Sequence, residues 1–267
     1  MIINLHLLDA CNYSCGHCFA RFGANKMLHC GEWKNIIDNI LSGIDVERFN
    51  LAGGEPLLYS SLAELSDYIR SKGSAVSIIT NGYGLTNKKI DTLQKNGIST
   101  IGISIDSPNA GTLRKLGRCT ASGDILDPGK CVNLCRYIKK KGMTLKINSV
   151  ISKLNYNEDF NAFINGVLPD RWKLLKIKKF NTNNFDNSSL LINDFQFENF
   201  LQRHREIPHI AEKTMENAYI MVDAFGNLID TGSYNNKPIA NLLKTSFKDA
   251  FLSMKFDYSL YQNRYAA

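Results

Sequence analysis

The feature that most constrains the fold is a regular alternation of strand-like and helix-like segments over the first two thirds of the chain. Strands that alternate with helical crossovers run parallel, with right-handed connections. Six such units fall short of the eight of a closed barrel, so we expect an α/β fold with an open, partial (βα)6 barrel. Short apolar runs favour strands at residues 2–8, 46–51, 75–79, 100–105, 145–150 and 172–177, and apolar spacing favours helices at 30–42, 62–71, 88–96, 131–141 and 158–167.

The last third of the chain has a different pattern. Residues 181–187 are rich in Asn and are predicted to form a loop, and residues 194–204 and 247–254 favour helices. Residues 219–222 and 228–229 flank a short polar turn, which is typical of a hairpin. We therefore expect residues 1–180 to form the barrel, and residues 181–267 to form an extension that covers its open face and contributes to the substrate site.

Composition and charge restrict the class of protein. With 44% hydrophobic and 21% charged residues, the 267-residue chain resembles an ordinary globular protein. No apolar run approaches the roughly 20 residues that span a bilayer, so no membrane partner is expected. The net charge of +7 suits a polyanionic ligand, either a phosphorylated small molecule or a nucleic acid. Because no nucleic-acid-binding motif is found, we expect no nucleic-acid partner. We also predict that the protein is a monomer and is cytoplasmic.

Three cysteines, Cys11, Cys15 and Cys18, stand at C-x3-C-x2-C spacing in the loop after the first strand. Three thiolates on one short loop can ligate three irons of a cubane cluster and leave the fourth iron open. Two alternatives are a zinc site with a distant fourth ligand and a set of disulfides. No second cysteine pair of the zinc-knuckle type occurs, and no signal peptide precedes the first strand, so reduced thiols are expected. The other cysteines are expected to be buried and structural: Cys30, Cys119, Cys131 and Cys135.

Polar and glycine-rich stretches follow several of the predicted strands. The cysteine loop, Gly53-Gly54-Glu55, Asn81 and Ser104 all lie at such strand ends. Loops at the carboxyl ends of parallel strands meet on one side of a barrel and build its site. We therefore expect one shared site there.

Four stretches together resemble the viperin family of radical S-adenosylmethionine (SAM) enzymes, and the resemblance covers nearly the whole chain. They are residues 11–13 (CNY), 50–56 (NLAGGEP), 146–151 (KINSVI) and 171–173 (RWK). The resemblance implies a [4Fe-4S] cluster and SAM as cofactors, and the radical SAM barrel as the fold. It also implies conversion of a nucleoside triphosphate into its 3′-deoxy-3′,4′-didehydro form, a chain terminator used in antiviral or anti-phage defence, through a 5′-deoxyadenosyl radical that takes the ribose 4′-hydrogen.

The resemblance also implies roles on the cofactor side. Cys11, Cys15 and Cys18 match the cluster ligands. The other matching positions are expected to contact SAM, around its amino group, carboxylate, ribose and adenosyl group: Phe19, Gly53, Gly54, Glu55, Asn81, Ser104 and Arg118. Each has a structural alternative, such as a tight turn for the glycines, a core hydroxyl for Ser104 and a solvated charge for Arg118.

On the substrate side, the family positions for the nucleotide are Asn4, Arg48, Lys146, Asn148, Arg171 and Lys173. Lys146 and Asn148 are two residues apart on one strand and so face the same side, and Arg171 and Lys173 have the same relation on the next strand. The alternative is an outward-facing basic surface. Tyr219 matches a family tyrosine near the substrate and is a candidate catalytic proton donor, or else an ordinary strand aromatic. Arg48 stands where the family has lysine, and Ala52 where it has serine.

The expected partners are CTP, UTP or GTP as substrate and an electron donor such as flavodoxin or ferredoxin. One alternative is another radical SAM enzyme, such as a peptide-modifying maturase. Those enzymes commonly carry a cysteine-rich C-terminal extension, whereas the last cysteine here is Cys135. A non-catalytic metal-binding or nucleic-acid-binding protein is the alternative from a different class.

Overall fold

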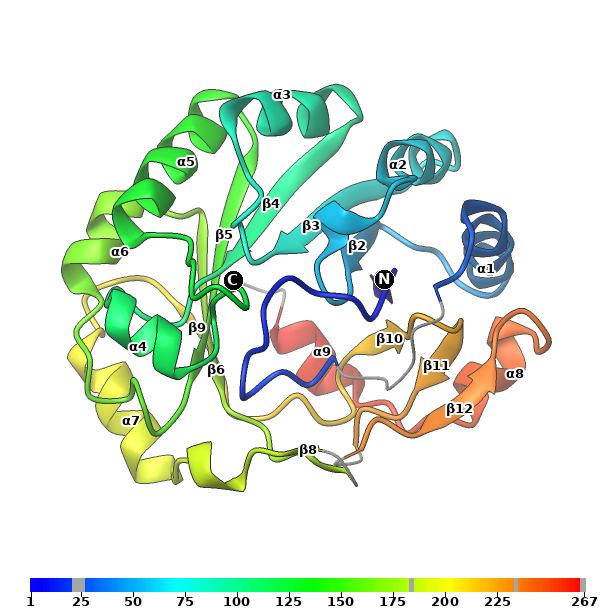
Figure 1. The fold of residues 1–267 in the computed structure, drawn as a ribbon. Coiled ribbons are helices and arrows are strands. Elements are labelled where there is room, and N and C mark those ends of the chain that lie inside the picture. The colour runs from blue at the N-terminus through cyan, green and yellow to red at the C-terminus, as the bar shows by residue number, and fades with distance from the viewer. Residues whose placement is uncertain (21–26, 183–184, 233–234, 265–267) are drawn as a thin grey trace.

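The computed structural model describes residues 1–20, 27–182, 185–232 and 235–264, and all structural statements concern these residues. Its centre is an arc of parallel strands, seen around the middle of Figure 1. Six of them follow one another in chain order, each paired in parallel with the next, as predicted for a partial (βα)6 barrel. They are β1 (Ile2–His6), β2 (Arg48–Ala52), β3 (Ala75–Thr80), β4 (Ile98–Ser104), β5 (Thr144–Ile151) and β6 (Arg171–Lys176).

Strands from beyond residue 180 extend this sheet at both edges. β9 (Ile210–Glu212) pairs in parallel with β6, and β10 (Ile220–Val222) pairs in parallel with β1. β11 (Asn227–Ile229) and β12 (Pro238–Asn241) continue antiparallel from β10. The predicted hairpin is therefore confirmed, but its first strand also pairs with the barrel. The unpaired backbone groups of edge strands favour such additions, so the extension joins the sheet as well as packing on it.

Helices cover the outer side of the arc (Figure 1). Each buries an apolar stripe against the strands, as α1 does with Trp33, Ile36, Ile37 and Ile40. Burial of these large side chains on the outer face leaves the polar residues of the strands to face the inside of the arc. The covering helices are α1 (Cys30–Gly43), α2 (Leu62–Ser71), α3 (Asn87–Lys95), α5 (Pro128–Lys140) and α6 (Asn161–Val167).

Several segments differ from the prediction for local reasons. Residues 110–115 form a helix that was not predicted, α4 (Ala110–Lys115), because the Asn109 side chain accepts from the Gly111 and Thr112 N–H groups and caps it. α5 begins earlier than predicted because Asp127 caps its first turn and Pro128 fits there. The predicted loop at 181–187 contains two short paired strands, β7 (Asn181–Thr182) and β8 (Phe185–Asp186).

The remaining elements lie in the extension and in short connections. They are the 3-10 helices η1 (Pro56–Leu58) and η2 (Ser188–Leu190), and the helices α7 (Asp194–Arg203), α8 (Phe247–Leu252) and α9 (Tyr258–Asn263). α9 was not predicted; the Asp257 side chain caps it by accepting from the Leu260 N–H. Among the described residues, no helix combines the length and apolar character needed to cross a bilayer.

Candidate active site

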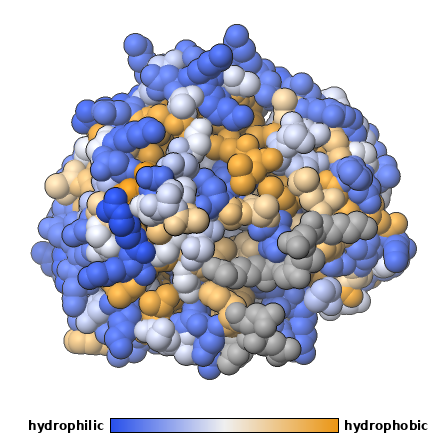
Figure 2. Space-filling model, in the orientation of Figure 1, coloured by the Kyte–Doolittle hydropathy of each residue, from blue (hydrophilic) through white to orange (hydrophobic). Residues whose placement is uncertain are grey.

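One pocket opens at the carboxyl ends of the barrel strands and continues into the arc. On the face seen in Figure 2, hydrophobic residues gather toward the centre and strongly hydrophilic ones lie around the rim. Of the predicted site residues, Glu55 and Arg171 do not line the pocket. All the others do: Asn4, Cys11, Cys15, Cys18, Phe19, Arg48, Gly53, Gly54, Asn81, Ser104, Arg118, Lys146, Asn148, Lys173 and Tyr219. We call the part around the three cysteines the cysteine end, and the part around Arg48, Lys146 and Lys173 the cationic end.

Backbone hydrogen bonds fix the cysteine loop against the segment after α4. The N–H groups of Ser14 and Gly16 donate to the carbonyls of Gly117 and Leu116, at 3.3 and 2.9 Å. The Tyr13 hydroxyl accepts from the Leu126 N–H at 2.8 Å. Gly117 has φ +71°, and a Cβ there would lie 2.5 Å from the Ser14 carbonyl oxygen. Only glycine therefore allows the two segments to approach this closely.

A second backbone contact joins the cysteine loop to the turn after β2. The Gly54 N–H donates to the Leu8 carbonyl at 2.6 Å, and the Glu55 N–H donates to the Ala10 carbonyl at 2.9 Å. A Cβ on Gly54 would lie 2.0 Å from the Ala10 oxygen. The glycine pair thus places the turn directly against the first residues of the loop.

Glu55 is turned away from the pocket and organises the end of β3. Its carboxylate accepts from the Thr80 hydroxyl at 2.6 Å, and from the N–H groups of Asn81 at 2.8 Å and Leu57 at 3.1 Å. Burial raises the pKa of Glu55, and these hydrogen bonds oppose that rise. The Asn81 amide in turn donates to Asn12 Oδ1 at 2.7 Å and lies 3.8 Å from Cys11 Sγ. Glu55 therefore acts on the cysteine loop through Asn81.

Arg118 connects the cysteine loop to a buried carboxylate. Its Nη1 lies 3.4 Å from Cys15 Sγ, and its Nε lies 2.9 Å from Asp106 Oδ2. The same carboxylate oxygen lies 3.1 Å from His17 Nε2. Burial would raise the pKa of Asp106, but the Arg118 charge and His17 outweigh it and hold the pKa below its usual value. Asp106 thus stays ionised and orients Arg118, a role that the sequence did not reveal.

The residues of the loop fit a cubane cluster. None of the three cysteines is in a disulfide, and Cys11 is exposed, Cys18 half-buried and Cys15 buried. The Arg118 guanidinium lies beside Cys15 Sγ, and the Asn81 amide lies beside Cys11 Sγ. A positive charge and an N–H donor next to a sulfur favour its thiolate form, which is the form that binds iron. No three His, Cys, Asp or Glu side chains among the described residues are grouped to hold one metal ion. Because a cubane binds each thiolate to a different iron, its ligands stand farther apart than those of a single ion.

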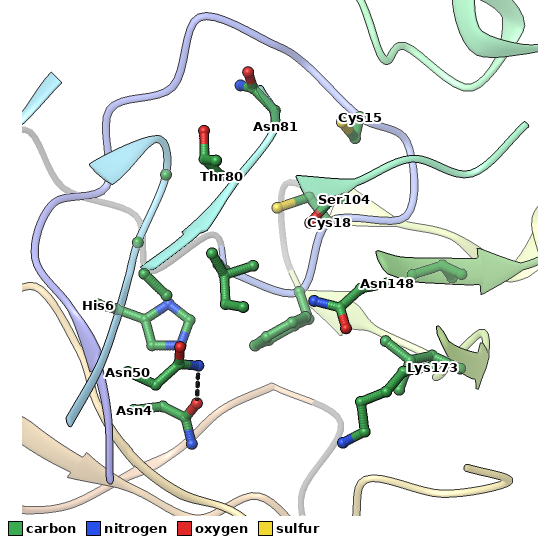
Figure 3. A pocket seen from close by; sticks show the side chains of 18 of the residues that line it. Asn4, His6, Cys15, Cys18, Asn50, Thr80, Asn81, Ser104, Asn148 and Lys173 are labelled. Atoms are coloured by element: carbon green, nitrogen blue, oxygen red, sulfur yellow. Dashed lines mark hydrogen bonds between the residues drawn. The ribbon is translucent and has the colours of Figure 1, made fainter. Parts of the chain in front are cut away.

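A chain of hydrogen-bonded polar side chains runs along one wall of the pocket, across β1, β2 and β3, and Figure 3 shows its link between Asn4 and Asn50. Asn4 Nδ2 donates to the Ile220 carbonyl at 3.2 Å, Asn50 Nδ2 donates to Asn4 Oδ1 at 2.7 Å, and the Ser77 hydroxyl donates to Asn50 Oδ1 at 2.9 Å. The chain fixes the direction of each amide. His6 lies beside it, and burial lowers the pKa of His6 to about 4, so its imidazole is neutral at physiological pH.

The cationic end is built from neighbouring strands. The β5–β6 register sets Lys146 beside Arg171 and Asn148 beside Lys173. Lys146 and Lys173 are only 8% and 7% exposed, which excludes the alternative of an outward-facing basic surface for these two residues. Burial, and then the charges of Lys173, Arg48 and Arg171, lower the pKa of Lys146 to about 8. The positive charges at this end therefore repel one another, and a bound anion would reduce that repulsion.

Two charged residues next to this end were not predicted from the sequence. Glu212 ends β9 and Arg264 follows α9, and both are buried. Glu212 forms an ion pair with Lys173 and accepts the hydroxyl hydrogen of Tyr219 at 2.7 Å. The Arg264 guanidinium lies 3.8 Å from the centre of the Tyr219 ring. Neither residue belongs to a recognisable motif, so only their burial could have singled them out.

The cysteines outside the motif do not line the pocket. Cys131 and Cys135 are buried on α5, with their sulfurs 3.9 Å apart, as expected for structural residues. Cys30 and Cys119 are half-buried, so the prediction of burial was wrong for these two.

Comparison with known proteins agrees with this geometry. Residues 5–167 match the model of the Radical SAM superfamily. The chain is 37% identical to an S-adenosylmethionine-dependent nucleotide dehydratase of Selenomonas ruminantium, over 99% of this chain and 98% of that protein. It is 30% identical to a protein of the same name from Psychrobacter lutiphocae, over 99% of this chain and 94% of that protein.

Among solved structures, Streptococcus suis SuiB bound to S-adenosylmethionine superposes with a TM-score of 0.71. The match covers 98% of this chain and 66% of SuiB, at 15% sequence identity. At that identity the likeness concerns the fold, and it supports the partial barrel described above.

Proposed function

Because this chain belongs to the radical SAM superfamily and, within it, to the viperin family of S-adenosylmethionine-dependent nucleotide dehydratases, we propose that it dehydrates a nucleoside triphosphate. The product is the 3′-deoxy-3′,4′-didehydro nucleotide, a chain terminator suited to antiviral or anti-phage defence. The observation that carries the proposal is the pairing, in one pocket, of a three-cysteine loop with a buried cationic end.

The cofactors are a [4Fe-4S] cluster and SAM, as in the superfamily. When bound, they supply the 5′-deoxyadenosyl radical that takes the ribose 4′-hydrogen. Cys11, Cys15 and Cys18 hold the cluster in this proposal. Gly53 and Gly54 bring the backbone close to SAM, while Arg118 pairs with its carboxylate. The proposed SAM site also includes Phe19, Asn81 and Ser104, with Glu55 positioning Asn81.

The nucleotide lies with its phosphates at the cationic end and its ribose toward the cysteine end. Lys146, Lys173 and Arg48 hold the triphosphate, with Arg171 adding charge from beside Lys146. Asn4 and Asn148 also line the pocket, and in this proposal they orient the sugar. Burial of the lysines strengthens these contacts because surrounding water screens them less.

Loss of the 3′-hydroxyl as water requires one proton and one electron in addition to removal of the 4′-hydrogen. Tyr219 is the proposed source of the proton, because it lines the pocket next to Lys173, with its hydroxyl 3.5 Å from Lys173 Nζ. An external low-potential electron carrier of the flavodoxin or ferredoxin class supplies the electron. The proposal further includes a monomer in a reducing, cytoplasmic compartment, where the seven cysteines, none of which is in a disulfide, remain thiols. Residues 181–267 act as a cover for the barrel.

The test is to incubate the anaerobically reconstituted, reduced protein and SAM with CTP, UTP, GTP and ATP separately. We expect the didehydro product from at least one of the first three, with 5′-deoxyadenosine formed in step, both measured by liquid chromatography and mass spectrometry. Cluster-loaded protein that cleaves SAM equally with and without every nucleotide would contradict the proposal and favour another substrate class, such as a peptide.

A further inference from the structure

A buried carboxylate lies behind the residues that line the cationic end of the pocket. Glu212 ends β9 and sits opposite Leu175 of β6 in the sheet register. It does not line the cavity, but it contacts Lys173 and Tyr219, which do. The side chain is only 3% exposed, so its charge must be balanced by neighbouring groups.

The contacts of Glu212 tie three side chains together. Oε1 faces Lys173 Nζ in an ion pair. Oε2 accepts from the Tyr219 hydroxyl at 2.7 Å and lies 3.4 Å from Arg264 Nη2. Arg264 is held in turn by the carbonyls of Thr214 and Ala218, at 2.6 and 3.3 Å. A single carboxylate thus orients a lysine of the barrel together with a phenol and a guanidinium of the extension.

The charge around Lys173 explains why such a carboxylate is needed. Burial lowers the pKa of Lys173, and the nearby Arg264 and Arg171 lower it further, whereas the ion pair with Glu212 opposes all three. Lys146 and Arg48 add positive charge from β5 and β2. Among the described residues, the other carboxylate paired with a cation of this set is the exposed Glu47, which lies 3.3 Å from Arg48.

We propose that Glu212 is a positioning residue: before the nucleotide binds, it holds Lys173, Tyr219 and Arg264 in the arrangement that the phosphates meet, and it keeps Lys173 charged. The inference rests on the proposed function for the identity of the ligand. On binding, phosphate oxygens compete with the carboxylate for Lys173 and Arg264. Glu212 therefore competes directly with the phosphates, but it also keeps Lys173 in the charged form that binds them.

The test measures binding of CTP, and of inorganic tripolyphosphate as a base-independent probe, to the cluster-loaded full-length protein without reductant. Titration calorimetry is run from pH 6.5 to 8.5, and each Kd is divided by that of the parent protein to cancel titration of the phosphates. At pH 6.5, Glu212→Gln should bind at least as tightly as the parent. By pH 8.5 its relative Kd should rise on the order of tenfold, the loss of one charge-assisted contact.

Three variants control this result. Glu212→Asp keeps the charge and should restore the pH profile of the parent. Glu198→Gln makes the same chemical change on α7, in an exposed pair with Lys213, and should leave the profile unchanged. Adding Lys173→Met to Glu212→Gln should abolish the additional rise. A parent-like profile for Glu212→Gln, or a rise that persists without Lys173, would overturn the proposal.

Urea unfolding separates this proposal from the proposed function. Glu212→Gln and Lys173→Met should each lower the unfolding midpoint. The double variant should lower it by less than their sum, because neither member of the Glu212–Lys173 pair is then left without the other. Additive shifts would refute the Glu212 role even if nucleotide binds. If the parent binds neither CTP nor tripolyphosphate, the proposed function fails, and the unfolding cycle still decides whether Glu212 supports Lys173.

Discussion

The two ends of the pocket are built in different ways. At the cysteine end, short segments of backbone lock together: the Gly54 N–H meets the Leu8 carbonyl at 2.6 Å, and the Gly16 N–H meets the Leu116 carbonyl at 2.9 Å. At the cationic end, long side chains converge from β2, β5, β6, β9 and the residue after α9. An atom added at a close backbone contact forces the segments apart. An anion held by several cations, in contrast, loses only part of its binding energy when one cation is removed. We therefore expect single substitutions to abolish cofactor binding at the cysteine end, but only to weaken nucleotide binding at the cationic end.

The largest effect is expected from the cluster ligands. Cys15→Ala should abolish 5′-deoxyadenosine formation and lower the iron and sulfide content of the reconstituted protein, because three thiolates are needed to hold the cluster. Cys131→Ala removes another buried thiol, from α5, and should retain both cluster content and 5′-deoxyadenosine formation. Loss of the cluster from Cys131→Ala, as complete as from Cys15→Ala, would show that the ligands are wrongly assigned.

A methyl group at the turn after β2 tests how rigid the backbone contact is. Gly54→Ala should reduce SAM binding to the cluster-loaded protein to near background, because the added Cβ would lie 2.0 Å from the Ala10 oxygen and the turn must move. Gly31→Ala is the matched control, since a Cβ there meets no atom within 4 Å. Normal SAM affinity in Gly54→Ala, measured by equilibrium dialysis, would mean that the turn is flexible.

At the cationic end, removal of one lysine should weaken binding without eliminating it. Lys173→Ala should cost about 1.5–3 kcal/mol of nucleotide binding, on the order of 10- to 100-fold in Kd, with slow SAM cleavage remaining. Lys176→Ala removes a lysine of the same strand that pairs with Asp194 outside the pocket, and should bind normally. Equal Kd values for the two variants would place the phosphates elsewhere.

Tyr219 distinguishes chemistry from binding at the same end. Tyr219→Phe should bind SAM and nucleotide and still cleave SAM, yet form several-fold less didehydro product per 5′-deoxyadenosine, because the hydroxyl is the proposed proton source. Tyr137→Phe loses a phenol that donates to Asp91 on the outer helices and serves as the control. An unchanged product ratio in Tyr219→Phe would reduce Tyr219 to a packing residue.

The smallest effect concerns pH. The pKa of Lys146 is lowered to about 8, so the folded protein releases this proton before the unfolded chain does. Stability should therefore rise with pH between about 8 and 10, because the unfolded state then binds more protons. Nucleotide affinity should change in the opposite direction, falling at most about tenfold per pH unit above pH 8. Lys146→Arg stays charged and should remove both trends in unfolding and binding experiments; their persistence would assign them to another group.

The features that depend on local chemistry could be predicted from the order of the residues alone. Alternating apolar periodicity led to the parallel arc, since each strand and helix buries its own apolar face. The cysteine spacing and the glycine pair are contiguous motifs, so their place at the strand ends could be predicted. Because side chains two residues apart on a strand face the same side, Lys146 could be placed with Asn148, and Arg171 with Lys173. The β5–β6 register sets the two pairs side by side.

The distant residues that complete the cationic end could be identified only from the folded chain. Glu212 and Arg264 lie 52 residues apart in a region without motifs, and they meet because β9 pairs with β6 while α9 packs nearby. Edge pairing depends on backbone groups that every residue carries, so it leaves no signature in the sequence. The same holds for Asp106, whose role comes from the burial it shares with Arg118 and His17. Burial and long-range pairing turn ordinary charged residues into parts of a site, and both arise only when the whole chain folds.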